Sequence, residues 1–203
     1  GSVPQLCFDN RGTSPVLLLD GEELVGAKQN RILNASILVG TGTVTRIPVS
    51  CVEQGRWSWR SRHFGASNRV LYPSARRGKM AQVSESLAFD GKFDSDQSQI
   101  WADIAGKSAR MRVHSDTGAS AALYEQRASD LTAVVGAFKP AQAQVGAVFF
   151  IDGRLCGLEL VGCPRLFTRL FPKLVRSYAL DLLDQRMSVP SGAKQTAQDA
   201  PST

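Results

Sequence analysis

The sequence predicts an α+β fold in which an N-terminal antiparallel β-sheet or sandwich is followed by helices, a β-hairpin and a C-terminal helix. Three observations indicate this order. Before residue 53, apolar residues fall in short runs that glycine-rich turns separate. After residue 97, apolar residues recur at the spacing of a helix face. An Asp-Gly pair at residues 152–153 then joins two short apolar runs, which is typical of a hairpin.

The N-terminal strands are predicted over residues 4–9, 16–19, 28–39 and 44–52. The second run is continuously apolar and ends at the turn pair Asp20-Gly21, whereas the others alternate apolar and polar residues. The turn at residues 40–42 indicates that the third and fourth strands pair antiparallel. Short strands with such turns favour a meander or a sandwich.

Residues 54–96 show no clear periodicity and are rich in Arg, Ser and Gly, so we expect an irregular segment within the domain. No acidic residue lies between Glu53 and Glu85. The interval holds seven basic residues: Arg56, Arg60, Arg62, Arg69, Arg76, Arg77 and Lys79. Because the whole chain has a net charge of +6, the segment is either a solvated basic loop or a surface for an anionic partner.

Three helices and a hairpin are predicted in the C-terminal half. Apolar residues between positions 100 and 111 lie at helical spacing, and a second helix is expected over residues 119–138. The hairpin strands are expected at residues 145–151 and 155–161. The last helix follows, with Pro172 in its first turn, where a missing N–H has no cost.

Composition indicates one α+β domain over residues 3–187, since 203 residues that are 43% hydrophobic are enough for one large core. Residues 188–203 are mostly Ser, Gly, Gln, Pro and Thr, which is typical of a disordered tail. No apolar run approaches the roughly 18 residues that a membrane span needs. We therefore expect no membrane partner.

The cysteines and histidines are too scattered for a zinc site. The four cysteines form no Cys-x-x-Cys pair, and the two histidines are not clustered with them. We expect no metal site, reduced thiols and a cytoplasmic protein. Glycine-rich phosphate loops are also absent from the sequence, which argues against a Rossmann dehydrogenase or a P-loop enzyme. The sequence indicates no particular cofactor.

Two blocks, residues 21–31 and 47–57, concentrate carboxylate, amide, guanidinium and thiol groups at predicted strand ends. Because side chains alternate along a strand, Gln29 and Arg31 extend the core-facing side of one strand. Glu53 extends the same side of the next strand. Antiparallel pairing brings these extensions to one end of the sheet, so Arg31 and Glu53 are expected to approach each other.

This arrangement has two interpretations. In the first, Arg31 and Glu53 form a partly buried ion pair, while Gln29 and Asn30 satisfy backbone groups. In the second, the same groups line a pocket. Arg31 and Arg56 would then hold a phosphate or carboxylate through planar two-point contacts, and the amides would recognise hydroxyl or amide groups.

The neighbouring residues extend the pocket hypothesis. Either Glu22 or Glu53 would supply acid or base chemistry. Since adjacent strand residues point to opposite faces, only one of Glu22 and Glu23 can face the pocket, and we favour Glu22. Trp57 is either a core residue or a surface on which a base stacks. Cys51 is expected to be a buried structural cysteine, because no base adjoins it in the sequence.

The two blocks resemble a known family, the ARG (ADP-ribosylglycohydrolase) and rhodanese-phosphatase-superfamily-associated protein domain. Residues 144–159 and 177–179 are also similar to that family, and the resemblance covers residues 3–183. By position, the family motif maps onto Glu22, Gln29, Asn30, Arg31, Cys51, Glu53, Arg56 and Trp57.

The resemblance implies that the chain processes or binds an ADP-ribose-type nucleotide, because members are associated by gene context with ADP-ribose and NAD-processing proteins. Glu22 and Glu53 are then the catalytic candidates for hydrolysis or transfer at a glycosidic or phosphoester bond. The ligand-binding candidates are Gln29, Asn30, Arg31, Arg56 and Trp57. Two alternatives stay open: a nucleotide-sensing or protein-interaction domain without turnover, and a nucleic-acid-binding domain that uses residues 56–79.

Overall fold

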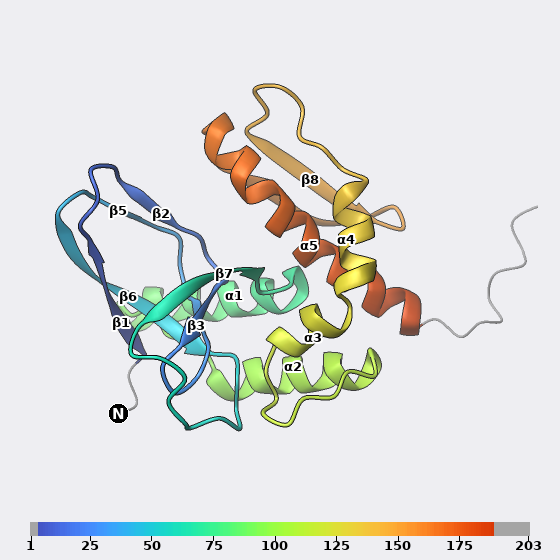
Figure 1. The fold of residues 1–203 in the computed structure, drawn as a ribbon, viewed down its shortest axis with the longest axis horizontal. Helices are drawn as coiled ribbons and strands as arrows, with labels where there is room; N and C mark the ends of the chain where they lie inside the picture. Colours follow the sequence, from blue (N-terminus) through green and yellow to red (C-terminus); the bar gives the residue numbers. More distant parts are fainter. Residues whose placement is uncertain (1–3, 189–203) are drawn as a thin grey trace, which may run out of the picture.

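The computed structural model describes residues 4–188 (Figure 1). Strands from the N-terminal part of the chain form a curled antiparallel layer, and the last helix lies between this layer and a C-terminal hairpin. The predicted α+β class and the predicted order of sheet, helices, hairpin and final helix are confirmed. The predicted tail begins at Ser188, the last described residue, and otherwise lies outside the described part of the chain.

The curled layer consists of two antiparallel sheets. The larger one has the strand order β1 (Gln5–Asn10), β6 (Thr43–Cys51), β4 (Arg31–Leu33), β3 (Glu22–Gly26) and β7 (Phe64–Val70). The smaller one pairs β2 (Val16–Leu18) with β5 (Ile37–Val39). Buried side chains from both sheets, including Leu18, Leu33 and Val49, share one apolar cluster. The sheets therefore curl around a common interior.

The helices build the main core against the sheets. They are α1 (Pro73–Asp90), α2 (Gln97–Arg110), α3 (Ala121–Gln126), α4 (Ala128–Gly136) and α5 (Pro164–Ser188). Ile104, Leu123, Leu131 and Leu180 come from four different helices and are almost wholly buried in one cluster. The hairpin of β8 (Gly146–Ile151) and β9 (Arg154–Leu160) packs on α5 at the edge of the molecule (Figure 1).

The single strand predicted over residues 28–39 is wrong. It consists of β4 and β5, which belong to different sheets. The chain bends at Asn34, whose buried side chain accepts a hydrogen bond from Ser50 Oγ (2.8 Å) and donates one to the Phe93 carbonyl (2.9 Å). A buried polar side chain needs such partners, and meeting them at the bend redirects the strand.

The irregular segment predicted over residues 54–96 is also wrong in its second half. Phe64–Val70 is the edge strand β7, and Pro73–Asp90 is an 18-residue helix. The helix buries Arg76 and Lys79 on the face that packs against the sheet. Because charged residues occupy core-facing positions, the apolar periodicity that predicts a helix is hidden in the sequence.

Two predicted helix boundaries need correction. Residues 119–138 contain two short helices, because Arg127 has φ −110° and ψ 18°, which are not helical values. The last helix begins at Pro164, so Pro172 lies inside it and not in its first turn. Pro164 itself occupies the first helical position, where proline is favoured.

Candidate functional site

A cavity of about 980 Å³ opens on the concave side of the curled layer. Its apolar walls come from β1, β2, β3 and β6, and the loop before β7 supplies Trp57, Trp59, Arg62 and His63. Four predicted site residues line it, namely Glu22, Gln29, Arg31 and Trp57. The structure therefore brings part of both sequence blocks to one cavity, as the pocket interpretation requires.

Glu22 is the carboxylate that reaches this cavity from the strand β3. Its Oε1 accepts a hydrogen bond from Lys173 Nζ on α5, and its Oε2 accepts the Leu19 backbone N–H at 3.3 Å. Glu23 points to the other side of the strand, where it binds Arg69 and Asn30. The predicted orientation of the two carboxylates thus matches the structure. Lys173 lies 151 residues away in sequence, and no local pattern could have paired it with Glu22.

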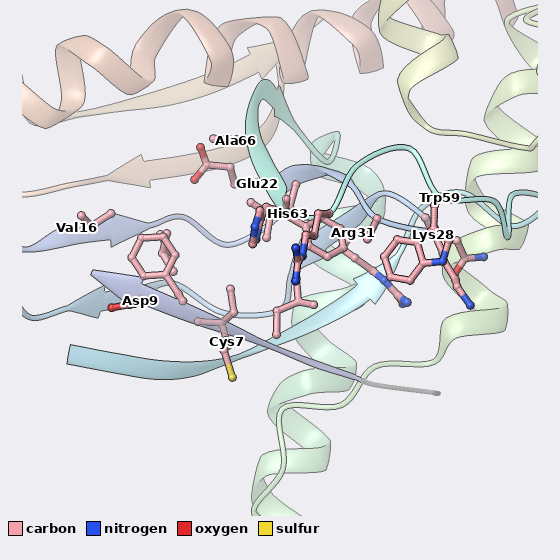
Figure 2. Close-up of a pocket in the computed structure, with 18 of the residues that line it drawn as sticks. Cys7, Asp9, Val16, Glu22, Lys28, Arg31, Trp59, His63 and Ala66 are labelled. Carbon is pink, nitrogen blue, oxygen red and sulfur yellow. The ribbon is translucent and has the colours of Figure 1, made fainter. Parts of the chain in front are cut away.

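Arg31 lies on the cavity wall without a carboxylate partner among the described residues. Its Nη1 donates to Cys51 Sγ, which is directly opposite in the β4–β6 register, and its buried Nε has no hydrogen-bond partner. In Figure 2, Arg31 lies along the cavity with Lys28 and Trp59 near its guanidinium end. A buried N–H without a partner has a cost of about 1–3 kcal/mol. Arg56 Nε is in the same state, so what distinguishes Arg31 is the lack of a carboxylate partner among the described residues.

The predicted approach of Arg31 and Glu53 is wrong. β6 ends at Cys51, so the alternation that placed Glu53 on the same face stops two residues before it. Glu53 instead pairs with Arg56, with 2.7 Å between Arg56 Nη2 and Glu53 Oε2. The ion-pair interpretation therefore describes Glu53 correctly but assigns it the wrong arginine.

The carboxylate of Glu53 is closed off by its neighbours. It also accepts the Asn30 backbone N–H (3.1 Å) and the Thr117 hydroxyl (3.0 Å), and it is 5% exposed. Burial acts to raise the pKa of Glu53, but the hydrogen bonds from Arg56, Asn30 and Thr117 outweigh it and hold the pKa below its ordinary value. Glu53, Asn30 and Arg56 do not line the cavity. This placement supports a structural role for them.

Gln29 and Cys51 connect the hydrogen-bonded cluster around Glu53 to the wall of this cavity. Gln29 Nε2 donates to the Glu53 carbonyl (3.0 Å), and Gln29 Oε1 accepts from Cys51 Sγ (2.9 Å). Burial raises the pKa of the Cys51 thiol, the charge of Arg31 opposes this, and the charge of Glu53 adds to it. A thiol with a raised pKa is a poor nucleophile at neutral pH, in agreement with the predicted structural role of Cys51.

Two tryptophans lie at the mouth of the cavity. Trp57 and Trp59 are 61% and 68% exposed, so the interpretation of Trp57 as a core residue is wrong. Lys28 Nζ lies 5.4 Å from the centre of the Trp59 ring. Lys28, Trp59, Arg62 and His63 also line the cavity and were not among the predicted site residues. The alternation of Trp and Arg over residues 56–60 was the signal that pointed to this loop.

A second cavity of about 500 Å³ lies on the other side of the same wall. It shares Gln29, Arg31 and Trp57 with the first cavity. Its remaining polar lining residues are Asn34, Ser50, Asp94, Ser95 and Gln97. Trp101 lines it as well, and its indole N–H is buried without a partner. Arg31 therefore borders an apolar and aromatic chamber on one side and a hydroxyl-rich chamber on the other.

More than half of the cations in the basic segment are neutralised by acids, three of which lie in distant parts of the chain. Four of its seven cations form ion pairs: Arg56 with Glu53, Arg69 with Glu23, Arg76 with Glu159 and Lys79 with Asp20. Arg60, Arg62 and Arg77 form none among residues 4–188. The charge cluster seen in the sequence is therefore not a continuous basic surface in the fold.

A comparison of the chain with known protein families shows to which family it belongs. The model of the ARG and Rhodanese-Phosphatase-superfamily-associated Protein domain matches residues 1–202. The chain belongs to this family. Membership of the ARG and Rhodanese-Phosphatase-superfamily-associated Protein domain family confirms the resemblance carried by the two blocks. No curated protein and no solved structure matches the chain.

Over residues 4–188, no group of three or more His, Cys, Asp and Glu side chains is placed to hold a metal ion. None of the helices in that range combines the length and apolar character needed to cross a bilayer.

Proposed function

We propose that the paired cavities bind an ADP-ribose-type nucleotide through Arg31. The observation that carries this proposal is the state of that side chain: its guanidinium lines both cavities, has no carboxylate partner among the described residues and leaves its buried Nε unbonded. A guanidinium in this state suits the diphosphate of a nucleotide, which it can contact at two points. Family membership supplies the link to ADP-ribose only by association.

The two chambers suit the two ends of such a ligand. Lys28 and Arg62 line the larger chamber with Arg31 and can add positive charge around a diphosphate, while Trp57 and Trp59 offer faces for an adenine ring. Ser95 and Asp94 in the smaller chamber offer partners for ribose hydroxyls. The volumes of about 980 and 500 Å³ are in the range of small-molecule sites.

Glu22 is the catalytic candidate that this geometry retains. Its carboxylate lines the larger chamber and is oriented by Lys173 and by the Leu19 N–H. As a general base it would take a proton from water, which would then attack a glycosidic or phosphoester bond of the bound nucleotide. A sensing domain would use the same cavity without this step.

Nucleic-acid binding through residues 56–79 is the weaker alternative. Four of the seven cations are already paired, and a paired cation contributes less to the counterion release that drives such binding. The cations that line the cavity, Arg31, Lys28 and Arg62, lie beside aromatic residues in a concave site. This favours a small anionic ligand.

The test is a calorimetric titration of the full chain with ADP-ribose, together with Arg31→Ala and Arg77→Ala. Arg77 is an exposed cation on α1 that forms no ion pair within residues 4–188 and lines neither cavity, so it matches the loss of charge. We expect saturable binding that weakens at least tenfold in Arg31→Ala and stays unchanged in Arg77→Ala. Thermal denaturation of each variant checks that it is folded.

Product analysis after the titration separates the functions. Products from the wild type that disappear in Glu22→Gln, with binding retained, would establish an enzyme that uses this carboxylate. Saturable binding without products would establish a sensor. Absence of heat at millimolar ADP-ribose, or equal weakening in Arg31→Ala and Arg77→Ala, would overturn the assignment to this cavity.

A further inference from the structure

The β8–β9 hairpin is fixed to the rest of the molecule by one face. Phe149 stacks on Tyr178 of α5, with ring centres 3.8 Å apart and planes 3° apart. Gly157 lies directly against the same tyrosine, since a Cβ built there would lie 2.1 Å from its hydroxyl oxygen. Glu159 also points inward, where it binds Arg76 and the Tyr178 hydroxyl. The inner face is therefore closed by packing and by an ion pair.

The outer face of the hairpin is apolar and uncovered. Five large apolar residues on it have exposed fractions between 52% and 70%: Val148, Phe150, Leu155, Leu158 and Leu160. The register places Val148 opposite Leu158 and Phe150 opposite Leu155, so four of them form two cross-strand pairs. Leu160 extends the patch along β9. These residues form one continuous surface, which we call the hairpin face.

The hairpin face also lacks the features that keep an exposed strand pair in solution. β8 contains no charged residue, and the two charged residues of β9 are Arg154 at the turn and the inward Glu159. Exposed strands are normally protected by outward charges or by a covering element. A two-stranded sheet is marginally stable by itself, so a covering partner would stabilise this one.

We infer that the hairpin face is covered by the hairpin face of a second copy of this chain, in a symmetric dimer. The two sheets would pack face to face about a twofold axis, as layers of a sandwich do. The absence of charge from the face matters here, because two copies of a chain with net charge +6 can then meet without juxtaposing like charges. In Figure 1 the hairpin lies on the far side of α5 from the curled layer, so the contact leaves the cavities open.

The exposed area is of the size that such an interface needs. With about 200 Å² for one fully exposed large apolar residue, the five residues present roughly 600 Å². That value is at the upper end of about 300–600 Å² for the largest apolar patch of a typical monomer. A stable interface buries about 800 Å² on each partner, which the apolar patch and a narrow polar rim together supply. A membrane-binding face would carry several Lys and Arg residues around its rim. Here Arg154 is balanced by Asp152 in the same turn, and Lys139 borders the face beside Val148 and Phe150.

The experiment is sedimentation-velocity ultracentrifugation of the full chain over a dilution series, on the wild type, Leu158→Ser and Leu38→Ser. Leu38 is 69% exposed on β5 and lies outside the hairpin, so its substitution matches the loss of an exposed leucine. We expect a wild-type dimer that dissociates on dilution. The dimer dissociation constant should rise at least tenfold in Leu158→Ser, since this residue lies at the centre of the face, and stay unchanged in Leu38→Ser.

Three results would overturn the inference. One is a wild-type monomer at every concentration up to about 100 μM, because no specific dimer then forms at accessible protein concentrations. Another is a dimer that Leu158→Ser and Leu38→Ser affect equally. The third is a monomer that sediments with anionic lipid vesicles, which would assign the hairpin face to a membrane surface. Because both substituted residues are exposed, each variant should keep the far-ultraviolet circular dichroism spectrum of the wild type, which excludes unfolding as the cause.

Discussion

Arg31 and Arg56 come from the two sequence blocks and lie at the same end of the sheet, yet their surroundings are opposite. Arg56 pairs with Glu53 and also donates to the carbonyl groups of Ala27 and Ser58, each at 2.9 Å. Arg31 meets a thiol, has no carboxylate partner among the described residues and lines two cavities. The comparison separates a closed side of the sheet end, which stabilises the fold, from an open side, which can bind.

The two sides of the sheet end show that residue type alone does not distinguish a structural cluster from a candidate binding site. The Nε of each guanidinium is buried without a hydrogen-bond partner among the described residues, so this feature does not separate the two. The difference is that Arg56 has a carboxylate that neutralises its charge, whereas Arg31 has none among those residues and lines both cavities. Variants on each side should therefore separate stability from affinity.

The largest effect is expected on the closed side. Glu53→Ala leaves Arg56 buried without its partner and removes the acceptor of the Asn30 N–H, so the free energy of unfolding should fall by about 3–5 kcal/mol. Urea denaturation measures this change. The matched variant Glu125→Ala removes an exposed carboxylate that pairs with Arg69 at 3.4 Å, and it should cost less than about 1 kcal/mol. Equal losses in the two variants would contradict the closed-network interpretation.

A smaller effect is expected on the open side, and it should appear in affinity. Trp57→Ala removes an exposed ring at the cavity mouth, so ADP-ribose should bind about tenfold more weakly. The free energy of unfolding should change by less than about 0.5 kcal/mol. Phe89→Ala, which removes an exposed ring from α1 away from the cavity, is the control for both measurements. A loss of stability without a loss of affinity would show that Trp57 stabilises the fold and does not contact the ligand.

The smallest effect is expected in the pH dependence of the free energy of unfolding, and it comes from the ionisation of Glu53 on the closed side. Since the folded-state pKa of Glu53 is below its ordinary value of 4.5, its ionised form stabilises the fold above that value. This stabilisation should be lost as the pH falls through the folded-state pKa. Urea denaturation between pH 6 and pH 3 should show a shallower loss of stability in Glu53→Gln than in the wild type. Arg31→Ala should keep the wild-type slope, and a shallower slope there would contradict the division between the two sides.

Several features of the fold follow from local sequence. The hairpin about residues 152–153 follows from its Asp-Gly turn, and Pro164 marks the start of α5. Strand periodicity also predicted that Gln29 and Arg31 lie on the same side of one strand, and both line the cavity. The same argument failed for Glu53, because β6 ends at Cys51. These features depend on interactions between residues that are close in sequence or directly paired.

The features that the sequence did not predict depend on contacts between segments that are distant in the chain. Helix α1 was missed because Lys79 and Arg76 occupy its buried face, and their partners Asp20 and Glu159 lie 59 and 83 residues away. Lys173 was missed for the same reason, since only the packing of α5 against the sheet brings it to Glu22.

The sequence by itself determined the α+β class, the order of the elements, the family and the identity of the two polar blocks, because turns, periodicity and motifs are local properties. Only the packed fold shows that Lys173 orients Glu22 and that the buried cations of α1 pair with distant carboxylates. The physical reason is that the partner of a charged group is set by distance in space, and only the packed fold fixes that distance for residues far apart in the chain.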